Sequence, residues 1–242
     1  MFGQIFKVRR SPRPAGAAAA ARSNPYRSAQ TNDSYHALFC DDAKFYSPRT
    51  GERFMAWHAV LGNSNASPAA VRALALDPRA PSAARALAWH WLRLRSHGVP
   101  PQQLNGLVVE TGHAQGLDTL AVYADGSVRH FEPTGALVCV QAQDMQMQFA
   151  AMRATALAQS MLRTLPRAWG RQAAPVTPGS VRLSFVASDG LYVDEGPLSL
   201  MVHERLAGRV IGQVDDLRQL VRAVRRHPRA RQLADETMAQ AA

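Results

Sequence analysis

Two Asp-Gly pairs constrain the fold of this chain more than any other local signal. Asp125-Gly126 and Asp189-Gly190 each stand between two short apolar segments. Such a pair favours a tight β-hairpin, because both residues tolerate the positive φ angles that the turn requires. The sequence therefore predicts two antiparallel hairpins, and a two-residue turn at Asp125-Gly126 places Val122 opposite Arg129.

The apolar segments around these turns predict an antiparallel sheet. Each is short, rich in Val, Leu, Phe and Tyr, and bounded by glycine, proline or acidic turn residues, as expected of strands. A meander over 106–141 and a hairpin over 181–194 together give about six strands: 106–111, 117–124, 128–131, 137–140, 181–186 and 191–193.

Two long helices are predicted, one before and one after the hairpin over 181–194. Apolar residues recur every three or four positions in the helix predicted over 208–226, which is the spacing of an amphipathic helix. A second long helix over 144–165 has large side chains roughly along one side, at Met145, Phe149, Met152 and Met161. We expect an α+β fold in which these two helices cover one face of the sheet and the N-terminal helices pack at one end.

The N-terminal half is predicted to be mainly helical after a disordered basic arm. Residues 1–32 combine an alanine run and several prolines with six basic residues and no acid, so they cannot bury enough apolar surface to fold. Residues 33–105 contain a short strand at 38–40, a helix over 52–61 and a helical hairpin over 66–97, whose first helix begins at Ser67-Pro68. An α+β core over 106–227 and a tail over 228–242 complete the chain. We expect the arm to be a flexible extension rather than a targeting peptide.

Composition and motifs exclude several classes of protein. No segment reaches the roughly 20 apolar residues of a membrane helix. The two cysteines form neither a disulfide framework nor a metal motif, which favours a reducing cytoplasm. The histidines form no zinc motif, and the chain has no nucleophile elbow, phosphate-binding loop or dinucleotide fingerprint. We therefore expect neither a metal nor a cofactor.

The charge of the chain is basic and concentrated at its ends. The net charge is +10, and only two of the 28 basic residues are lysine. Arginine and alanine use of this kind is typical of a GC-rich bacterial genome. The candidate anion-binding residues lie in the last helix, away from its apolar side: Arg218, Arg222, Arg225 and Arg226. Such a face can bind phosphates, although most arginine faces are simply solvated.

The candidate catalytic residues gather in a polar segment predicted to be a loop over 110–118. Glu110, His113 and Asp118 offer two carboxylates and an imidazole between rigid strands, where binding groups are commonly held. Cys40 is a candidate nucleophile, but the neighbouring acids oppose formation of its thiolate. The alternative is a structural connection in which glycines supply the turn and Asp118 caps backbone groups.

The same region resembles a group of uncharacterised bacterial proteins. In these a QG-x-D-T-L-A-x-Y-x-DG-x-x-R segment recurs, and a later hairpin precedes a GP-containing helix. The matching residues are Gln115, Gly116, Asp118, Thr119, Leu120, Tyr123, Asp125, Gly126 and Arg129, then Gly190, Gly196 and Pro197. The resemblance covers less than half of the chain and implies no activity.

These observations favour a non-enzymatic cytoplasmic protein-interaction module that binds a protein partner or a second copy of itself. The alternative is a hydrolase that uses the 110–118 segment. A second alternative is binding of nucleic acid or an anionic surface by the arginine-rich ends.

Overall fold

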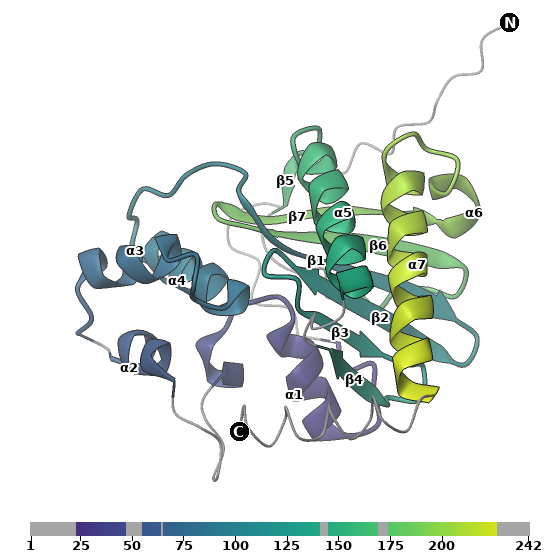
Figure 1. Ribbon diagram of the computed structural model, residues 1–242, viewed down its shortest axis with the longest axis horizontal. Coiled ribbons are helices and arrows are strands. Elements are labelled where there is room, and N and C mark those ends of the chain that lie inside the picture. The colour runs from purple at the N-terminus through teal and green to yellow at the C-terminus, as the bar shows by residue number, and fades with distance from the viewer. Residues whose placement is uncertain (1–22, 47–54, 64, 141–144, 169–173, 227–242) are drawn as a thin grey trace, which may run out of the picture.

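A computed structural model describes residues 23–46, 55–63, 65–140, 145–168 and 174–226. Its centre is one antiparallel sheet with the strand order β4-β3-β2-β1-β6-β7-β5 (Figure 1). The strands are β1 (Leu104–His113), β2 (Gly116–Tyr123), β3 (Val128–Phe131), β4 (Leu137–Val140), β5 (Arg167–Ala168), β6 (Ser180–Ala187) and β7 (Gly190–Pro197). The α+β prediction is confirmed. The sheet contains the six expected strands and one more, the two-residue β5.

Both Asp-Gly hairpins are present, and β1 joins them by pairing with β2 and β6. The register of the first hairpin differs from the prediction by one residue, since Val122 lies opposite Val128 and Ala121 opposite Arg129. The reason is a longer turn: Tyr123 N–H donates to the carbonyl of Ser127, and Gly126 takes a φ of +83°. A loop of this kind, with glycine in the left-handed region, is a common alternative to the two-residue turn.

One face of the sheet packs against α5 (Met145–Leu162) and α7 (Ala207–Arg226), as predicted. In Figure 1 the two helices run side by side across this face. The short α6 (Leu198–Met201) precedes α7. Strand side chains alternate between the faces, so Leu107, Val109 and Leu120 contact these helices while Val108 and Ala121 face the other way.

The N-terminal elements cover the second face, which corrects the expectation that they pack only at one end. They are α1 (Ala29–Ala37), the 3₁₀ helix η1 (Ala43–Tyr46), α2 (Ala56–Gly62), α3 (Pro68–Leu76) and α4 (Ser82–Leu94). Side chains of α1 and α4 join the core on this face. The helical hairpin α3–α4 is confirmed, and α2 and α3 lie beside α4 at one end of the molecule (Figure 1).

The folded part of the chain includes residues that the prediction assigned to the arm over 1–32. Tyr26 is buried, its ring stacks on Phe131, and its hydroxyl donates to Thr119 Oγ1 at 2.9 Å. Ser28 then caps α1. The strand predicted at 38–40 is absent, because α1 ends there and Cys40 takes a φ of +50°. Residues 1–22 and the predicted tail 228–242 lie outside the described residues.

Candidate functional site

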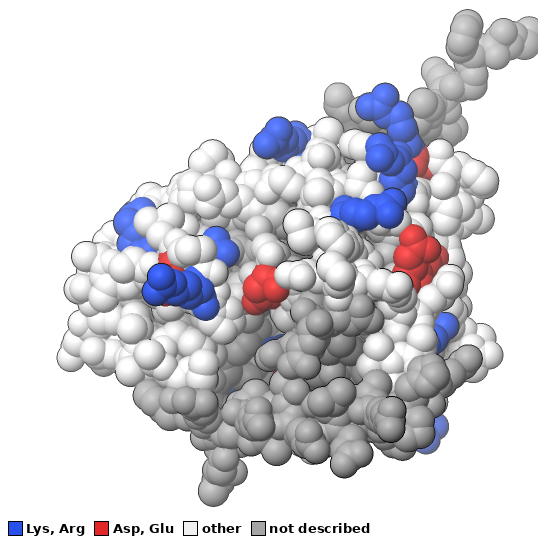
Figure 2. Space-filling model, viewed as in Figure 1, with Lys and Arg blue, Asp and Glu red and all other residues white. Residues whose placement is uncertain are grey.

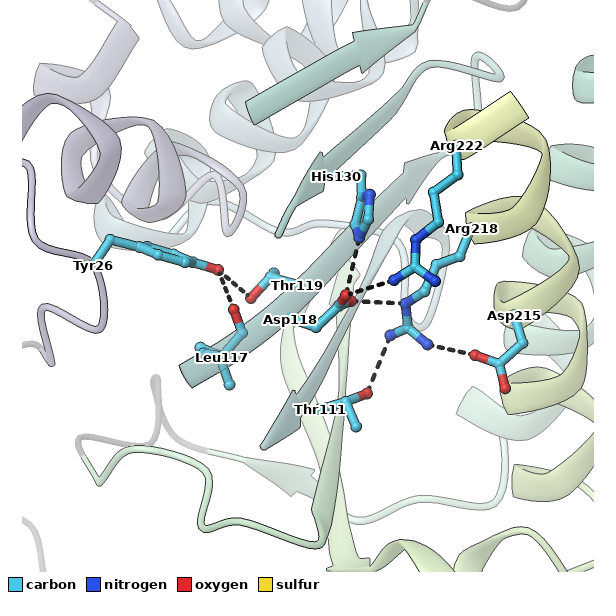
Figure 3. A network of polar contacts seen from close by, with 9 residues as sticks. All are labelled: Tyr26, Thr111, Leu117, Asp118, Thr119, His130, Asp215, Arg218 and Arg222. Atoms are coloured by element: carbon cyan, nitrogen blue, oxygen red, sulfur yellow. Dashed lines mark hydrogen bonds and ion pairs between the residues drawn. The ribbon is translucent and has the colours of Figure 1, made fainter. Parts of the chain in front are cut away.

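A buried network of charged side chains lies where α7 crosses the sheet (Figure 3). Its centre is Asp118 of β2, whose carboxylate Oδ2 lies 3.1 Å from Nε2 of His130 on β3. From α7, Arg218 places Nε 2.8 Å from Asp118 Oδ1, and Arg222 places a terminal nitrogen 3.4 Å from Oδ2. Asp118, predicted as a catalytic group, thus meets two residues predicted to bind anions.

Further contacts extend this network to β1 and to the surface. Arg218 donates to Thr111 Oγ1 at 3.1 Å and to the carboxylate of Asp215, one turn earlier on α7. Asp118 and His130 are buried, whereas the side chains of Arg222 and Asp215 are about half exposed. The network therefore fastens α7 to three neighbouring strands.

The charges around Asp118 keep it ionised. Burial by itself raises the pKa of this carboxyl group, but the hydrogen bond from His130 and the positive charges of Arg218 and Arg222 outweigh it. The pKa of Asp118 is therefore lowered from its ordinary value. A carboxylate surrounded by cations in this way stabilises the folded state and is already neutralised within the protein.

A catalytic triad with a nucleophile also contains an Asp–His pair. The surroundings of the second ring nitrogen of His130 therefore show whether this pair could serve a nucleophile. Its Nδ1 is buried and has no hydrogen-bond partner among the residues that the structure describes. A triad needs a hydroxyl or thiol at this nitrogen. The described part of the network has the orienting acid and the imidazole without the nucleophile.

The predicted catalytic residues do not meet in the structure. Glu110 and Asp118 point to opposite faces of the sheet: Glu110 accepts a hydrogen bond from Tyr35 of α1 at 2.7 Å, on the face away from α7. His113 is exposed at the end of β1. Cys40 is buried with its Sγ 3.2 Å from Tyr46 Oη, and burial raises the pKa of its thiol to about 12.

The segment 110–118 is not a loop, which corrects the prediction. β1 continues to His113 and β2 begins at Gly116, so only Ala114 and Gln115 form the turn. Gly116 has a φ of +138°, and a Cβ on Gly112 would lie 2.1 Å from the carbonyl oxygen of Thr177. The glycines thus serve backbone geometry and close packing.

The predicted arginine face of the last helix is also divided. Arg218 is buried and faces the sheet, and Arg222 contacts the same carboxylate. The side chains of Arg225 and Arg226, at the end of α7, lie outside the described residues.

The outer side of α5 forms an exposed apolar stripe. Met145, Phe149 and Met152 are 68%, 58% and 57% exposed, and their spacing of four and three residues aligns them on one side of the helix. The side that faces the sheet consists instead of Met161, Met147 and small residues such as Ala151 and Ala154. Of the large side chains predicted along one side, only Met161 belongs to the buried side.

The charge on and beside α5 has both signs, with arginine in excess. α5 contains no acidic residue, and Arg153 on α5 and Arg163 just after it are exposed. Arg205 and Arg209, before and within the first turn of α7, are exposed as well. The exposed acids of this neighbouring segment are Glu204, Asp215 and Asp216. In Figure 2 the surface over α5 carries little charge, and Lys and Arg side chains gather at one end of it, over the start of α7.

Comparisons with known protein families, with curated proteins and with solved structures find no match to this chain. Among the described residues, no three His, Cys, Asp or Glu side chains come together as metal ligands. No described helix has the length and apolar character to cross a membrane.

Proposed function

We propose that the chain is a non-enzymatic protein-binding module whose docking face is the outer stripe of α5, formed by Met145, Phe149 and Met152. The exposure of these three side chains carries the proposal. At about 200 Å² for each large side chain, they expose on the order of 350 Å². The largest apolar patch of a typical monomer is roughly 300–600 Å² and is often functional.

The stripe suits an amphipathic helix as its partner. Helical partners bind through apolar side chains at positions i, i+4 and i+7, which is the spacing of the stripe itself. Methionine is unbranched and polarisable, so methionine-rich surfaces adapt to different partner side chains. The rest of the fold supplies a rigid support, since the opposite side of α5 is buried against the sheet.

Charge complementarity favours an acidic partner helix. Arg153, Arg163 and Arg209 are exposed on or beside α5, which has no acid of its own. The exposed acids nearby, Asp215 and Asp216, lie on α7. Opposite charges at the edge of an apolar interface accelerate association and select the partner. Cys40 and Cys139 are free thiols, which suits a reducing compartment such as the cytoplasm.

The test uses two labelled helical peptides and the full-length chain. Both peptides carry leucine at i, i+4 and i+7; the remaining positions are mostly glutamate in one and mostly lysine in the other. Fluorescence anisotropy measures their binding at physiological ionic strength. We expect micromolar binding of the acidic peptide and at least about tenfold weaker binding of the basic one.

Two variants locate the binding face. Phe149→Asp places a charge within the stripe and abolishes binding of the acidic peptide. Ser160→Asp adds the same charge at an exposed position of α5 two turns beyond the stripe, and it changes the affinity less than about threefold. Equal losses in both variants, or no binding of either peptide, contradict the docking face. A wild-type dimer that Phe149→Asp converts to a monomer shows instead that a second copy occupies the stripe.

A further inference from the structure

Arg129 of β3 carries a positive charge inside the fold without an anionic partner. The two buried arginines, Arg182 and Arg218, each form ion pairs with two carboxylates. Arg129 is half-buried, and its guanidinium group forms neither an ion pair nor a hydrogen bond with any residue that the structure describes. A charge that is partly removed from water normally gains a partner, because the loss of hydration is costly. Arg129 therefore lacks the acceptors that the two buried arginines have.

The side chains around Arg129 are neutral. In the sheet it lies directly opposite Cys139 of β4, and the side chains of such a pair point to the same face. The carbon at the centre of its guanidinium group lies 5.9 Å from the centroid of the Tyr123 ring, which is a cation–π contact. Tyr46 and Cys40 also act on its charge. Burial raises the pKa of both tyrosines and both thiols, so none of the four carries a negative charge near neutral pH.

The acids of the neighbouring segments do not neutralise Arg129. Asp41 acts on the thiol of Cys40 and Asp125 acts on Tyr123. Neither acid forms an ion pair with Arg129 in the described part of the chain. Solvent reaches the guanidinium group, because none of its nitrogens is among the fully enclosed polar atoms that lack a partner in the described residues. An anion from solution can therefore approach Arg129 beside Cys139, which is half-buried on the edge strand β4.

We propose that Arg129 binds a small monocarboxylate with a short aliphatic chain. The paired N–H donors of a guanidinium group match the two oxygens of a carboxylate. The hydroxyl groups of Tyr46 and Tyr123 donate to backbone carbonyl oxygens, so the guanidinium group is the donor that faces the ligand. The ring of Tyr46 meets that of Trp57 at a centroid distance of 6.2 Å, and these aromatic side chains supply apolar surface for the aliphatic chain.

The charge of the site selects a monoanion. One carboxylate balances the single positive charge of Arg129. A phosphate dianion brings a second negative charge among neutral thiols and phenols, where its loss of hydration is not repaid. A neutral amide of the same shape offers one acceptor oxygen and no charge, so it forms the weaker hydrogen bond.

Four probes test this selectivity on the full chain. They are butyrate, butyramide, inorganic phosphate at about pH 8, where it is mainly a dianion, and chloride at the same ionic strength. Nuclear magnetic resonance titrations follow the backbone amides of β3 and β4. We expect saturable binding of butyrate with a Kd of about 1 mM or lower, and at least about tenfold weaker binding of butyramide and phosphate. Tightest binding of phosphate, equal shifts with chloride, or no saturation by butyrate at about 20 mM overturns the proposal.

Variants show whether Arg129 is the binding group. Arg129→Gln weakens butyrate binding at least about tenfold, and Arg129→Lys, which keeps the charge and loses the paired donors, weakens it at least about threefold. The melting temperature of Arg129→Gln stays the same or rises, because no ion pair is lost. Arg72→Gln is the matched control, since Arg72 of α3 is also half-buried without an ion pair in the described chain, and it leaves the affinity unchanged.

Butyrate binding of wild-type strength in both Arg129 variants, or an equal loss in Arg72→Gln, also contradicts a carboxylate site at Arg129. Phe149→Asp leaves butyrate binding intact, and Arg129→Gln leaves peptide binding at α5 intact. The two proposals therefore fail separately.

Discussion

Replacing Asp118 with asparagine tests whether the charged network fastens α7 to the sheet. The substitution keeps the shape of the side chain and removes its charge. Arg218 is then a largely buried cation that has lost the buried carboxylate 2.8 Å from its Nε, and His130 loses a charged acceptor. Breaking a buried ion pair by removal of one partner costs about 3–5 kcal/mol.

The structure places the expected loss at the lower end of this range. The amide oxygen of asparagine still accepts one hydrogen bond, and Arg218 keeps its contacts with Thr111 and Asp215. Arg222 is half exposed, so its share of the loss is at most about 1 kcal/mol. We expect the free energy of unfolding to fall by about 3 kcal/mol.

Urea unfolding followed by circular dichroism measures this loss. With a slope of about 2–3 kcal/mol per molar urea, the midpoint falls by about 1 M. Asp215→Asn is the matched control, because Asp215 contacts the same arginine but has a half-exposed side chain. Its substitution costs less than about 1 kcal/mol. If the two variants lose equal stability, the buried carboxylate does not anchor α7 and the reasoning is wrong.

Three further predictions follow from other contacts. Because the pKa of Asp118 is lower in the folded than in the unfolded chain, its stabilising effect is present above about pH 4 and disappears as the pH falls through the folded pKa. The difference in unfolding free energy between the wild type and Asp118→Asn therefore shrinks from pH 7 to pH 3. A difference that stays constant over this range refutes the prediction. Gly208→Ala lowers the melting temperature, because a Cβ at this position lies 2.2 Å from a backbone carbonyl oxygen. Gly212→Ala, in open space on the same helix, stabilises the protein by up to about 1 kcal/mol. Melting temperatures that shift in the same direction in both variants contradict this assignment. In a Cys139→Ser variant, a disulfide reagent at pH 8 does not modify the thiol of Cys40 until urea unfolds the protein. The reason is that this thiol is buried and its pKa is raised to about 12. Rapid reaction of the native protein shows an accessible thiolate instead.

Local signals predicted most of the elements of this fold. Asp125-Gly126 and Asp189-Gly190 fix turns through their own backbone preferences, so both hairpins could be read from the sequence. The recurrence of apolar residues every three or four positions predicted α7. The early start of the folded part could not be predicted, because Tyr26 is ordered by Thr119, 93 positions away, and no pattern near Tyr26 indicates that contact.

The register of one hairpin explains why the partner of Asp118 was missed. The two-residue turn expected at Asp125-Gly126 puts Arg129 on the same face as Val122 and Asp118, and it turns His130 to the other face. The actual turn is one residue longer, so His130 faces Asp118. A shift of one residue exchanges the two faces of a strand. Asp118 and Arg218 were each singled out, but for separate roles, since the ion pair between them joins distant parts of the chain.

The edge strands of a sheet determine whether another strand can add to it. The four-residue β4 forms one edge, and at the other edge the two-residue β5 pairs only with Leu191 and Tyr192 of the eight-residue β7. A long open edge allows a foreign strand to add to a sheet, and beyond Tyr192 the outer side of β7 has no strand partner among the described residues. Of the two edges, the β7 side therefore offers an added strand the longer template, whereas the short β4 exposes few backbone groups.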